Sequence, residues 1–266
     1  SGTTNGNAAV GSNNVTANTY GAAAGMDYRF TPDAIAGFAL AGGGTNWNLV
    51  QNLGGGRSSA FQAGVYGKMN FGPAYLAAAF GFANHWFTTD RTSFAGDQLS
   101  AKFQGQSYGG RFEAGYRLAV LSTAGVTPYA AVQAQSFHTP GYSETDLSGG
   151  GMALAYSAMN ATDTRSELGA RFDALQIVDT MPLVWHGRVA WAHDWVSNPA
   201  LGAAFQSLPG ASFTVNGAAP PANAALVSAG GKLFITPSWS FDAKFDGAFS
   251  GSSQTYAGTG TLRYAW

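Results

Sequence analysis

Ten charged side chains recur at every second position along a few stretches of the chain. This is the spacing at which side chains share one face of a β-strand. Acids and bases in such pairs serve either general acid–base chemistry or a hydrated ladder of ion pairs, because buried charges are tolerated only when they are paired or wet. We expect the ladder, lining a water-filled lumen, formed by Arg111, Glu113, Arg165, Glu167, Arg171, Asp173, Arg188, Asp242, Lys244 and Asp246.

Other signals of catalysis are weak. The four histidines, at positions 85, 138, 186 and 193, stand in no H-E-x-x-H or similar metal spacing. His193 and Asp194 are neighbours in an expected strand, which points their side chains to opposite faces. The chain has no cysteine, and its one G-x-S-x-G pattern, at 105–109, lies inside an expected strand and not at the strand-to-helix turn of a nucleophile elbow. We therefore expect no catalytic residue, no metal site and no cofactor.

The elements that must carry the charges are β-strands, because polar and apolar residues alternate with a period of two. In 239–249 the aromatic residues share one face and the charged residues share the other. The same rule predicts an outward face containing Tyr116, Phe172, Trp185, Trp191, Phe241, Phe245 and Phe249. We predict eleven strands, at 15–30, 34–46, 59–71, 74–88, 103–118, 127–138, 161–174, 183–196, 224–235, 239–249 and 255–266.

Composition favours a wall that spans a membrane. Charged residues are 10% of the 266 residues, against about 25% in soluble domains. No apolar run reaches the roughly 18 residues of a transmembrane helix, and no basic stripe suggests nucleic acid. A soluble β-sandwich would share the alternation, but its core needs close-packed aliphatic side chains. Here the apolar face mixes Ala, Gly and aromatic residues, so we predict an all-β antiparallel transmembrane barrel.

The connections alternate in length. Tight turns containing Pro, at 31–33, 72–73 and 236–238, alternate with long connections at 47–58, 89–102, 139–160 and 197–223. Bacterial barrels keep short turns in the periplasm and long loops outside, which places Trp266 in the periplasm and Ser1 outside. Their strand number is even, so we expect one domain, 1–266, lacking most of its first strand, with 1–14 a remnant of the first extracellular loop. Because it begins at Ser1 without a signal peptide, we expect a mature form or a fragment.

Six short motifs, in this order, resemble the autotransporter β-domain, the translocator of type Va secretion, and most of all the large-passenger autotransporters of α-proteobacteria. They are GMDYRF at 25–30, GVYG at 64–67, EAGYR at 113–117, TPYAA at 127–131, RSELGAR at 165–171 and LRYAW at 262–266. The resemblance implies a twelve-stranded barrel whose lumen holds an α-helix leading to an N-terminal passenger. The family's first strand, helix and passenger find no match here, in agreement with the odd strand count.

The last strand ends on alternate large apolar residues. Leu262, Tyr264 and Trp266 share one face. The resemblance implies that they form the signal read by the outer-membrane barrel-assembly machinery, although Thr261 stands where that signal has Gly. Such reading is β-augmentation, in which a free strand edge pairs with a partner's sheet. The alternative is that these residues only seal the wall and form its lower aromatic girdle.

The resemblance implies an outer-membrane translocator domain of a Gram-negative bacterium that exports an N-terminally fused passenger to the cell surface. The alternative is a small outer-membrane porin or channel, although diffusion porins have about 16 or more strands. Some outer-membrane barrels are enzymes with a Ser–His pair on the lipid face, so fold alone leaves this possibility open; we expect no enzyme. Expected partners are outer-membrane lipid and lipopolysaccharide, the assembly machinery and the covalently linked passenger. We expect no nucleic acid and a monomer.

Overall fold

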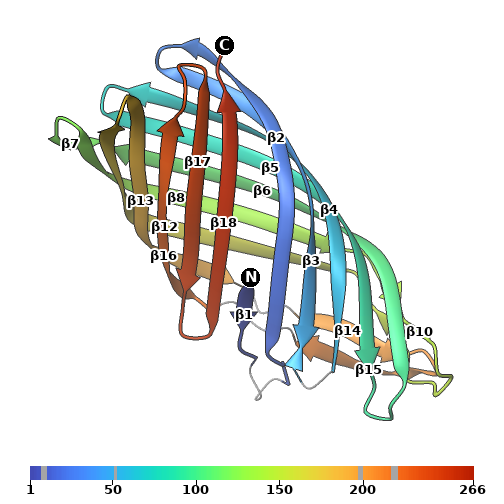
Figure 1. Ribbon diagram of the computed structural model, residues 1–266. Helices are drawn as coiled ribbons and strands as arrows, with labels where there is room; N and C mark the ends of the chain where they lie inside the picture. Colours follow the sequence, from blue (N-terminus) through green and yellow to red (C-terminus); the bar gives the residue numbers. More distant parts are fainter. Residues whose placement is uncertain (7–10, 51–52, 197–199, 217–220) are drawn as a thin grey trace.

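Twelve antiparallel strands of the described residues form a closed up-and-down ring (Figure 1). The structure is a computed structural model that describes residues 1–6, 11–50, 53–196, 200–216 and 221–266. The ring follows chain order: β1 (Gly2–Thr4), β2 (Val15–Thr31), β3 (Ala34–Leu49), β4 (Gly54–Phe71), β5 (Ala74–Thr92), β6 (Gln98–Tyr116), β8 (Ala124–Thr139), β12 (Met159–Val178), β13 (Met181–Val196), β16 (Asn223–Phe234), β17 (Trp239–Phe249) and β18 (Ser253–Tyr264).

Two pairings close the ring. β6 pairs with β8 from Gln106–His138 to Gly115–Tyr129. β1 lies between the last and the second strand and pairs with both: Gly2 stands opposite Thr255 of β18 and opposite Ala17 of β2. In Figure 1 the N-terminus and β1 lie at the end of the barrel where the long connections gather, and the C-terminus lies at the other end.

The predicted all-β barrel is confirmed, and each of the eleven predicted strands corresponds to one long strand. The bounds of β17 agree with the prediction at both ends. β4, β5 and β6 are longer than expected at the end with the long connections, where Gly54–Gly56 pair with Thr89–Arg91. The extensions of β4 and β5 contain only Gly and polar residues, so alternation of apolar residues does not mark them, whereas in the extension of β6 Leu99 and Ala101 alternate with polar residues. β1 lies inside 1–14, the range expected as loop; the twelfth strand of the ring therefore has three residues.

Two long connections expected as loops contain strands, which corrects that expectation. β9 (Tyr142–Ser143), β11 (Leu154–Tyr156), β14 (Ala200–Phe205) and β15 (Leu208–Asn216) form a second, four-stranded sheet. β10 (Thr145–Asp146) adds to the edge of β6. At the opposite end, β7 (Leu118–Leu121) folds back on the start of β8, so β6 ends at Tyr116 rather than at 118. These strands form by backbone pairing with segments far away in the chain, so the local sequence pattern does not predict them.

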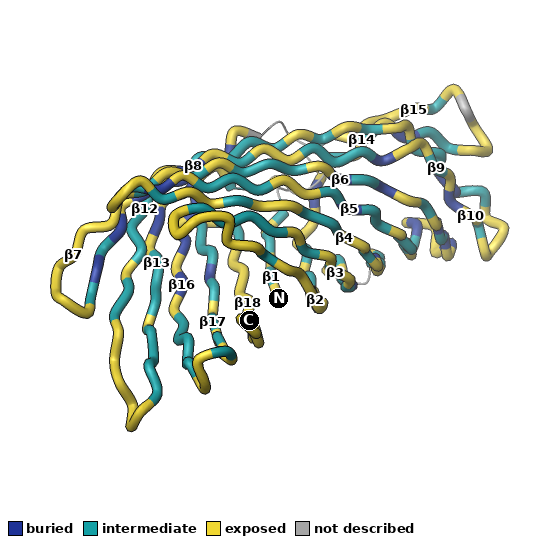
Figure 2. Tube along the Cα trace, turned by 90° about the horizontal axis from the view of Figure 1, so that it is seen from above, coloured by how far each residue is buried: buried dark blue, intermediate teal, exposed yellow. Residues whose placement is uncertain are grey.

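Exposure alternates along the strands of the ring (Figure 2). Six of the seven side chains expected on the outward face are 44–51% exposed, while Phe249 is half-buried against the ring of Tyr256. The ring is one continuous sheet rather than two packed layers. Within the described ranges no helix is long and apolar enough to cross a membrane.

The connection after β10 yields a pH prediction. The carboxylate of Asp146 accepts hydrogen bonds from the backbone N–H groups of Gly151, Gly149 and Ser148 at 2.7–2.9 Å, and these bonds lower the pKa of Asp146. The depressed pKa stabilises the loop above the ordinary Asp value of about 3.9, and this contribution is lost as pH falls through the lower folded value. Hydrogen exchange of 144–152 should show protection at about pH 6 that is reduced at about pH 3.

Asp146→Asn is the matched control, because an amide keeps an acceptor oxygen but does not titrate in this range. Its protection should be the same at both pH values. Wild-type protection that does not change between them would contradict the role given to the Asp146 carboxylate.

Candidate functional site: the charged interior of the barrel

The centre of the charged site is Glu167 on β12. Its carboxylate accepts two hydrogen bonds from Arg111 of β6, at 2.9 and 2.8 Å, and a third from the Tyr129 hydroxyl of β8 at 3.1 Å. Arg188 of β13 lies 3.7 Å away. Because the Glu167 residue is only 4% exposed, each of these partners offsets the cost of removing its charge from water.

Several contacts reach past neighbouring strands, which identifies the concave face of the wall. Arg111 crosses β8 to reach Glu167 on β12. Arg171 on β12 reaches Tyr75 on β5 at 2.7 Å, across both β8 and β6, and also binds the Glu113 carboxylate. Adjacent strands are about 4.8 Å apart, so side chains can converge over such spans only on the inside of a curved wall.

Glycine makes these crossings possible. A Cβ on Gly115 of β6 would come within 2.5 Å of the Tyr75 ring, which lies over this position on its way to Glu113 and Arg171. Gly37 of β3 has the same relation to Tyr66, whose hydroxyl donates to Asp27 of β2 at 3.1 Å. In both cases the absent side chain leaves room for a neighbour's ring to cross the strand.

The structure joins seven of the ten predicted lumen residues into one network. Arg188 links Glu167 to Asp246 at 3.9 Å, and Asp246 binds Lys244 at 2.8 Å. The members are Arg111, Glu113, Glu167, Arg171, Arg188, Lys244 and Asp246.

The other three predicted residues form separate pairs. Arg165 holds Asp194 through two hydrogen bonds of 2.6 and 2.8 Å. Asp173 binds Arg117, and Asp242 binds His186 at 3.0 Å. His193, next to Asp194 in β13, instead contacts the Trp191 and Trp195 rings, so the two neighbours point to opposite faces as expected.

Sequence reasoning missed several partners within the site. Tyr75 binds two of the predicted charges, Glu113 and Arg171, while Tyr129 and Asp194 each bind one. The alternation rule could have placed them on the charged face, because each stands an even number of residues away from other positions of that face in its strand. The rule says nothing about which strand lies opposite.

Asp27 and Arg263 form a further pair, 2.5 Å apart, between β2 and β18. These are the two strands that β1 separates at the other end of the barrel. The ion pair therefore joins the first and last long strands beyond the reach of the three-residue β1.

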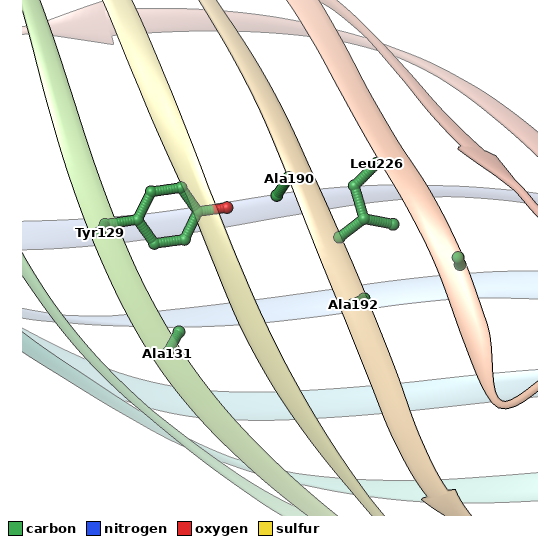
Figure 3. Packing of buried hydrophobic residues seen from close by; sticks show 6 residues of the cluster. Tyr129, Ala131, Ala190, Ala192 and Leu226 are labelled. Atoms are coloured by element: carbon green, nitrogen blue, oxygen red, sulfur yellow. The ribbon is translucent and has the colours of Figure 1, made fainter.

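The interior is partly hollow and partly packed. A cavity of about 690 Å³ is lined by Tyr75, Arg171, Arg188 and Lys244, among others. Further along the barrel, Tyr129, Ala131, Ala190, Ala192, Ala224 and Leu226 form an apolar cluster on β8, β13 and β16 (Figure 3). Among the described residues no group of three His, Cys, Asp or Glu side chains could hold a metal ion.

The second sheet is fastened to the wall near the long connections. Glu144 is buried and accepts two hydrogen bonds from Arg91 of β5, at 2.8 and 2.6 Å. Beside it, the Tyr142 ring stacks between Phe103 of β6 and Tyr156 of β11, with centroids 3.9 and 4.7 Å apart. Burial, together with the charge of Glu144, raises the pKa of Tyr142 to about 12, so its hydroxyl stays neutral.

The three residues of the expected assembly signal lie on the outer face at the end of β18. Leu262, Tyr264 and Trp266 are 63%, 49% and 79% exposed. The Tyr264 ring lies 4.9 Å from the Trp239 ring and 6.3 Å from the Trp266 ring. Three aromatic side chains from β17 and the end of the chain thus form one exposed cluster.

Comparisons with known proteins agree with this architecture. Residues 1–246 match the family model described as autotransporter beta-domain. The fold resembles the translocator domain of the autotransporter NalP from Neisseria meningitidis, with a TM-score of 0.78, 12% identity, and coverage of 100% of this chain and 84% of that one. It also resembles the β-domain of the Bordetella autotransporter BrkA (0.71, 14%, 100% and 96%). The transport unit of AIDA-I from Escherichia coli is a further match (0.59, 14%, 100% and 87%). No curated protein matches the chain in sequence.

Gly115 supplies a test of the strand-crossing contacts. Gly115→Ala should displace the Tyr75 ring and destabilise the barrel by about 1–3 kcal/mol, the usual cost of overpacking. Gly258→Ala on β18 is the matched control, because its Cβ would meet no atom within 4 Å. That change should be neutral or slightly stabilising. Urea unfolding of the two variants measures the difference, and equal stabilities would contradict the crowding at Gly115.

Proposed function

The chain belongs to the autotransporter β-domain family, and we propose that its charged interior serves translocation while its terminal strand directs assembly. The domain is a β-barrel of the Gram-negative outer membrane that mediates export of a passenger. The observation that carries this function is the family match over 1–246 on a closed ring. Members of the family are membrane-embedded and carry a passenger domain.

We propose that the ten charged residues line the lumen, and the contacts that converge on the concave face support this role. Acids and bases lie within ion-pair distance there, so a hydrated interior can hold them at small cost. We assign them to the wall of the path taken by the passenger segment. Their mutual pairing supports no catalytic role, and we propose that the domain is not an enzyme.

A diffusion porin is the less favoured function. Porins with an open channel have about 16 or more strands, whereas the described ring has twelve. The Arg111–Glu167 and Arg171–Tyr75 contacts also occupy part of the interior. Conductance of the full-length parent, with and without the segment that links barrel and passenger, would separate the two functions; a translocator should conduct well only without that segment.

The terminal strand is our candidate for recognition by the barrel-assembly machinery. Its exposed aromatic cluster and its free end suit pairing with a partner's sheet edge. Contact with lipid, including lipopolysaccharide, follows from the exposed apolar outer face. We propose a monomer, because β1 joins β2 to β18 within one chain.

A charge placed on the lipid face should impair insertion. Phe245 is 51% exposed on the outer face of β17, whereas Lys244 binds Asp246 on the inner face. Phe245→Arg at mid-bilayer depth should cost about 2–4 kcal/mol, while Lys244→Arg keeps its charge and its partner. Heat-modifiable mobility on gels after folding into vesicles measures the folded fraction; equal folded fractions for both variants would contradict the assignment of faces.

The terminal aromatic residues should control assembly of the full-length parent. We expect deletion of Trp266, or Tyr264→Asp combined with Trp266→Asp, to leave precursor in the periplasm in a protease-sensitive form. Passenger should then be lost from the cell surface although its own sequence is intact. Surface labelling of the passenger, with protease treatment of the periplasmic fraction, measures both effects.

Trp239→Ala is the matched control for that experiment. Trp239 packs against Tyr264 on the same outer surface, but it belongs to the penultimate strand. If only a girdle residue is needed, Trp239→Ala and the Trp266 deletion should impair display equally. Display at the wild-type level from the Trp266 deletion would show that the terminal aromatic is no assembly signal.

A further inference from the structure

Two cations stand on the outer face of the barrel, apart from all the others. The chain has thirteen Lys and Arg residues, and all of them are described. Register places eleven on the inner face or at the turns, in line with the Asp27–Arg263 and Arg111–Glu167 pairs. Arg57 on β4 and Lys102 on β6 have the opposite parity and are exposed. Their inner-face neighbours Ser58 and Ala101 are buried.

Arg57 and Lys102 lie on the same rung of the sheet, that is, in one row of residues paired across neighbouring strands. Arg57 pairs with Thr88 of β5, and Thr88 pairs with Lys102. One strand therefore separates the two cations, which puts their Cα atoms about 10 Å apart. The hydroxyl-bearing residue between them shares their face.

No carboxylate of the described residues forms an ion pair with either cation. The nearest acid on this face by register is Asp90, one two-residue step beyond Thr88, which is about 7 Å along the strand. The Lys and Arg side chains inside the barrel contact carboxylates, aromatic rings or carbonyl oxygens. Arg57 and Lys102 instead point outward, toward the surroundings of the barrel.

Arg57 and Lys102 lie at the edge of the apolar band, the belt of exposed apolar side chains on the outer face. One step below this rung stands Trp86, 47% exposed, and Phe80 and Phe112 further down are 51% and 54% exposed. At and above the rung, the outward positions of β3 to β6 are polar. A Trp at the end of an apolar band marks the membrane–water interface, so the two cations lie at headgroup level.

We propose that Arg57 and Lys102 bind the phosphate groups of lipopolysaccharide in the outer leaflet. The Arg guanidinium forms paired hydrogen bonds to phosphate, and Lys adds a point charge. Their aliphatic stems lie along the apolar wall while the charged heads stay in the polar layer. Charge complementarity selects the occupant: two cations that form no ion pair with a described carboxylate meet, at this depth, the anionic headgroups of the surrounding lipid. The inference rests on the proposed orientation, with the long connections outside.

The test is native mass spectrometry of the folded, detergent-solubilised barrel titrated with purified lipopolysaccharide. Arg57→Gln combined with Lys102→Gln should weaken binding by about tenfold or more. The matched control is Lys68→Gln with Lys232→Gln, which removes two cations from the inner face, where they lie 4.5 and 4.9 Å from the Tyr75 and Phe234 rings. The control should bind like the wild type, and heat-modifiable mobility verifies that each variant is folded.

Two further probes identify the group that is bound. Dephosphorylated lipopolysaccharide should bind the wild type no better than the phosphorylated form binds the outer-face double variant. Inorganic phosphate at equal concentration should not displace the lipid. Equal binding by the wild type and the outer-face variant would overturn the proposal, as would displacement by inorganic phosphate, which would mark a site for free anions. Failure of the translocator function would appear separately, as passenger missing from the surface of cells with the wild-type chain.

Discussion

Backbone pairing around a closed ring is the constraint on which the rest of this structure depends. A lipid environment offers no hydrogen bonds, so a strand edge left open there costs several kcal/mol for each group. Pairing between neighbouring strands satisfies these groups and at the same time decides the direction of every side chain. Among the described residues the exception is the seam between β2 and β18, where backbone pairing is limited to the three residues of β1. A slip of one residue at any interface would turn Arg111 or Glu167 toward lipid. The register of the strands is therefore fixed both by backbone pairing in the wall and by the ion pairs inside it.

The interior has to accommodate the charged side chains that the strand register directs inward. It does so with long side chains that cross strands and with small residues that let them pass. Tyr75 crosses at Gly115 and Tyr66 crosses at Gly37. Ala190 and Ala192 occupy inner positions beside larger partners such as Tyr129 and Leu226 (Figure 3). The outer face needs no such fit, because lipid chains adapt to its shape. Packing selects residue size inside the ring, and hydrophobicity selects residue type outside it.

Much of the ring could be predicted from the sequence, because its pattern is local. Alternation located the eleven long strands, and at 239–249 it gave both ends. The second, four-stranded sheet could not be predicted in this way. Its strands β9, β11 and β14 are short, and Glu144 meets Arg91 fifty-three residues away. The three residues of β1 carry no pattern at all. For the candidate site, parity indicated which charges share a face, but partners such as Tyr75 and Arg171 depend on which strands curve toward each other.

The distribution of charge between the two faces also sets how the barrel sits in its membrane. Charge on the outer face is tolerable only near the interfaces, where its cost falls from about 2–4 kcal/mol at the midplane to about 0–1. Arg57 and Lys102 therefore bound the apolar band at one end. From Trp86, one step below them, to Leu76 the outer face of β5 covers about 34 Å at about 3.4 Å per residue. A strand tilt of about 40° lowers this to about 26 Å, close to the apolar band of about 25 Å in bacterial barrels. The two outward cations thus stand at the level where the wall ceases to be compatible with lipid chains.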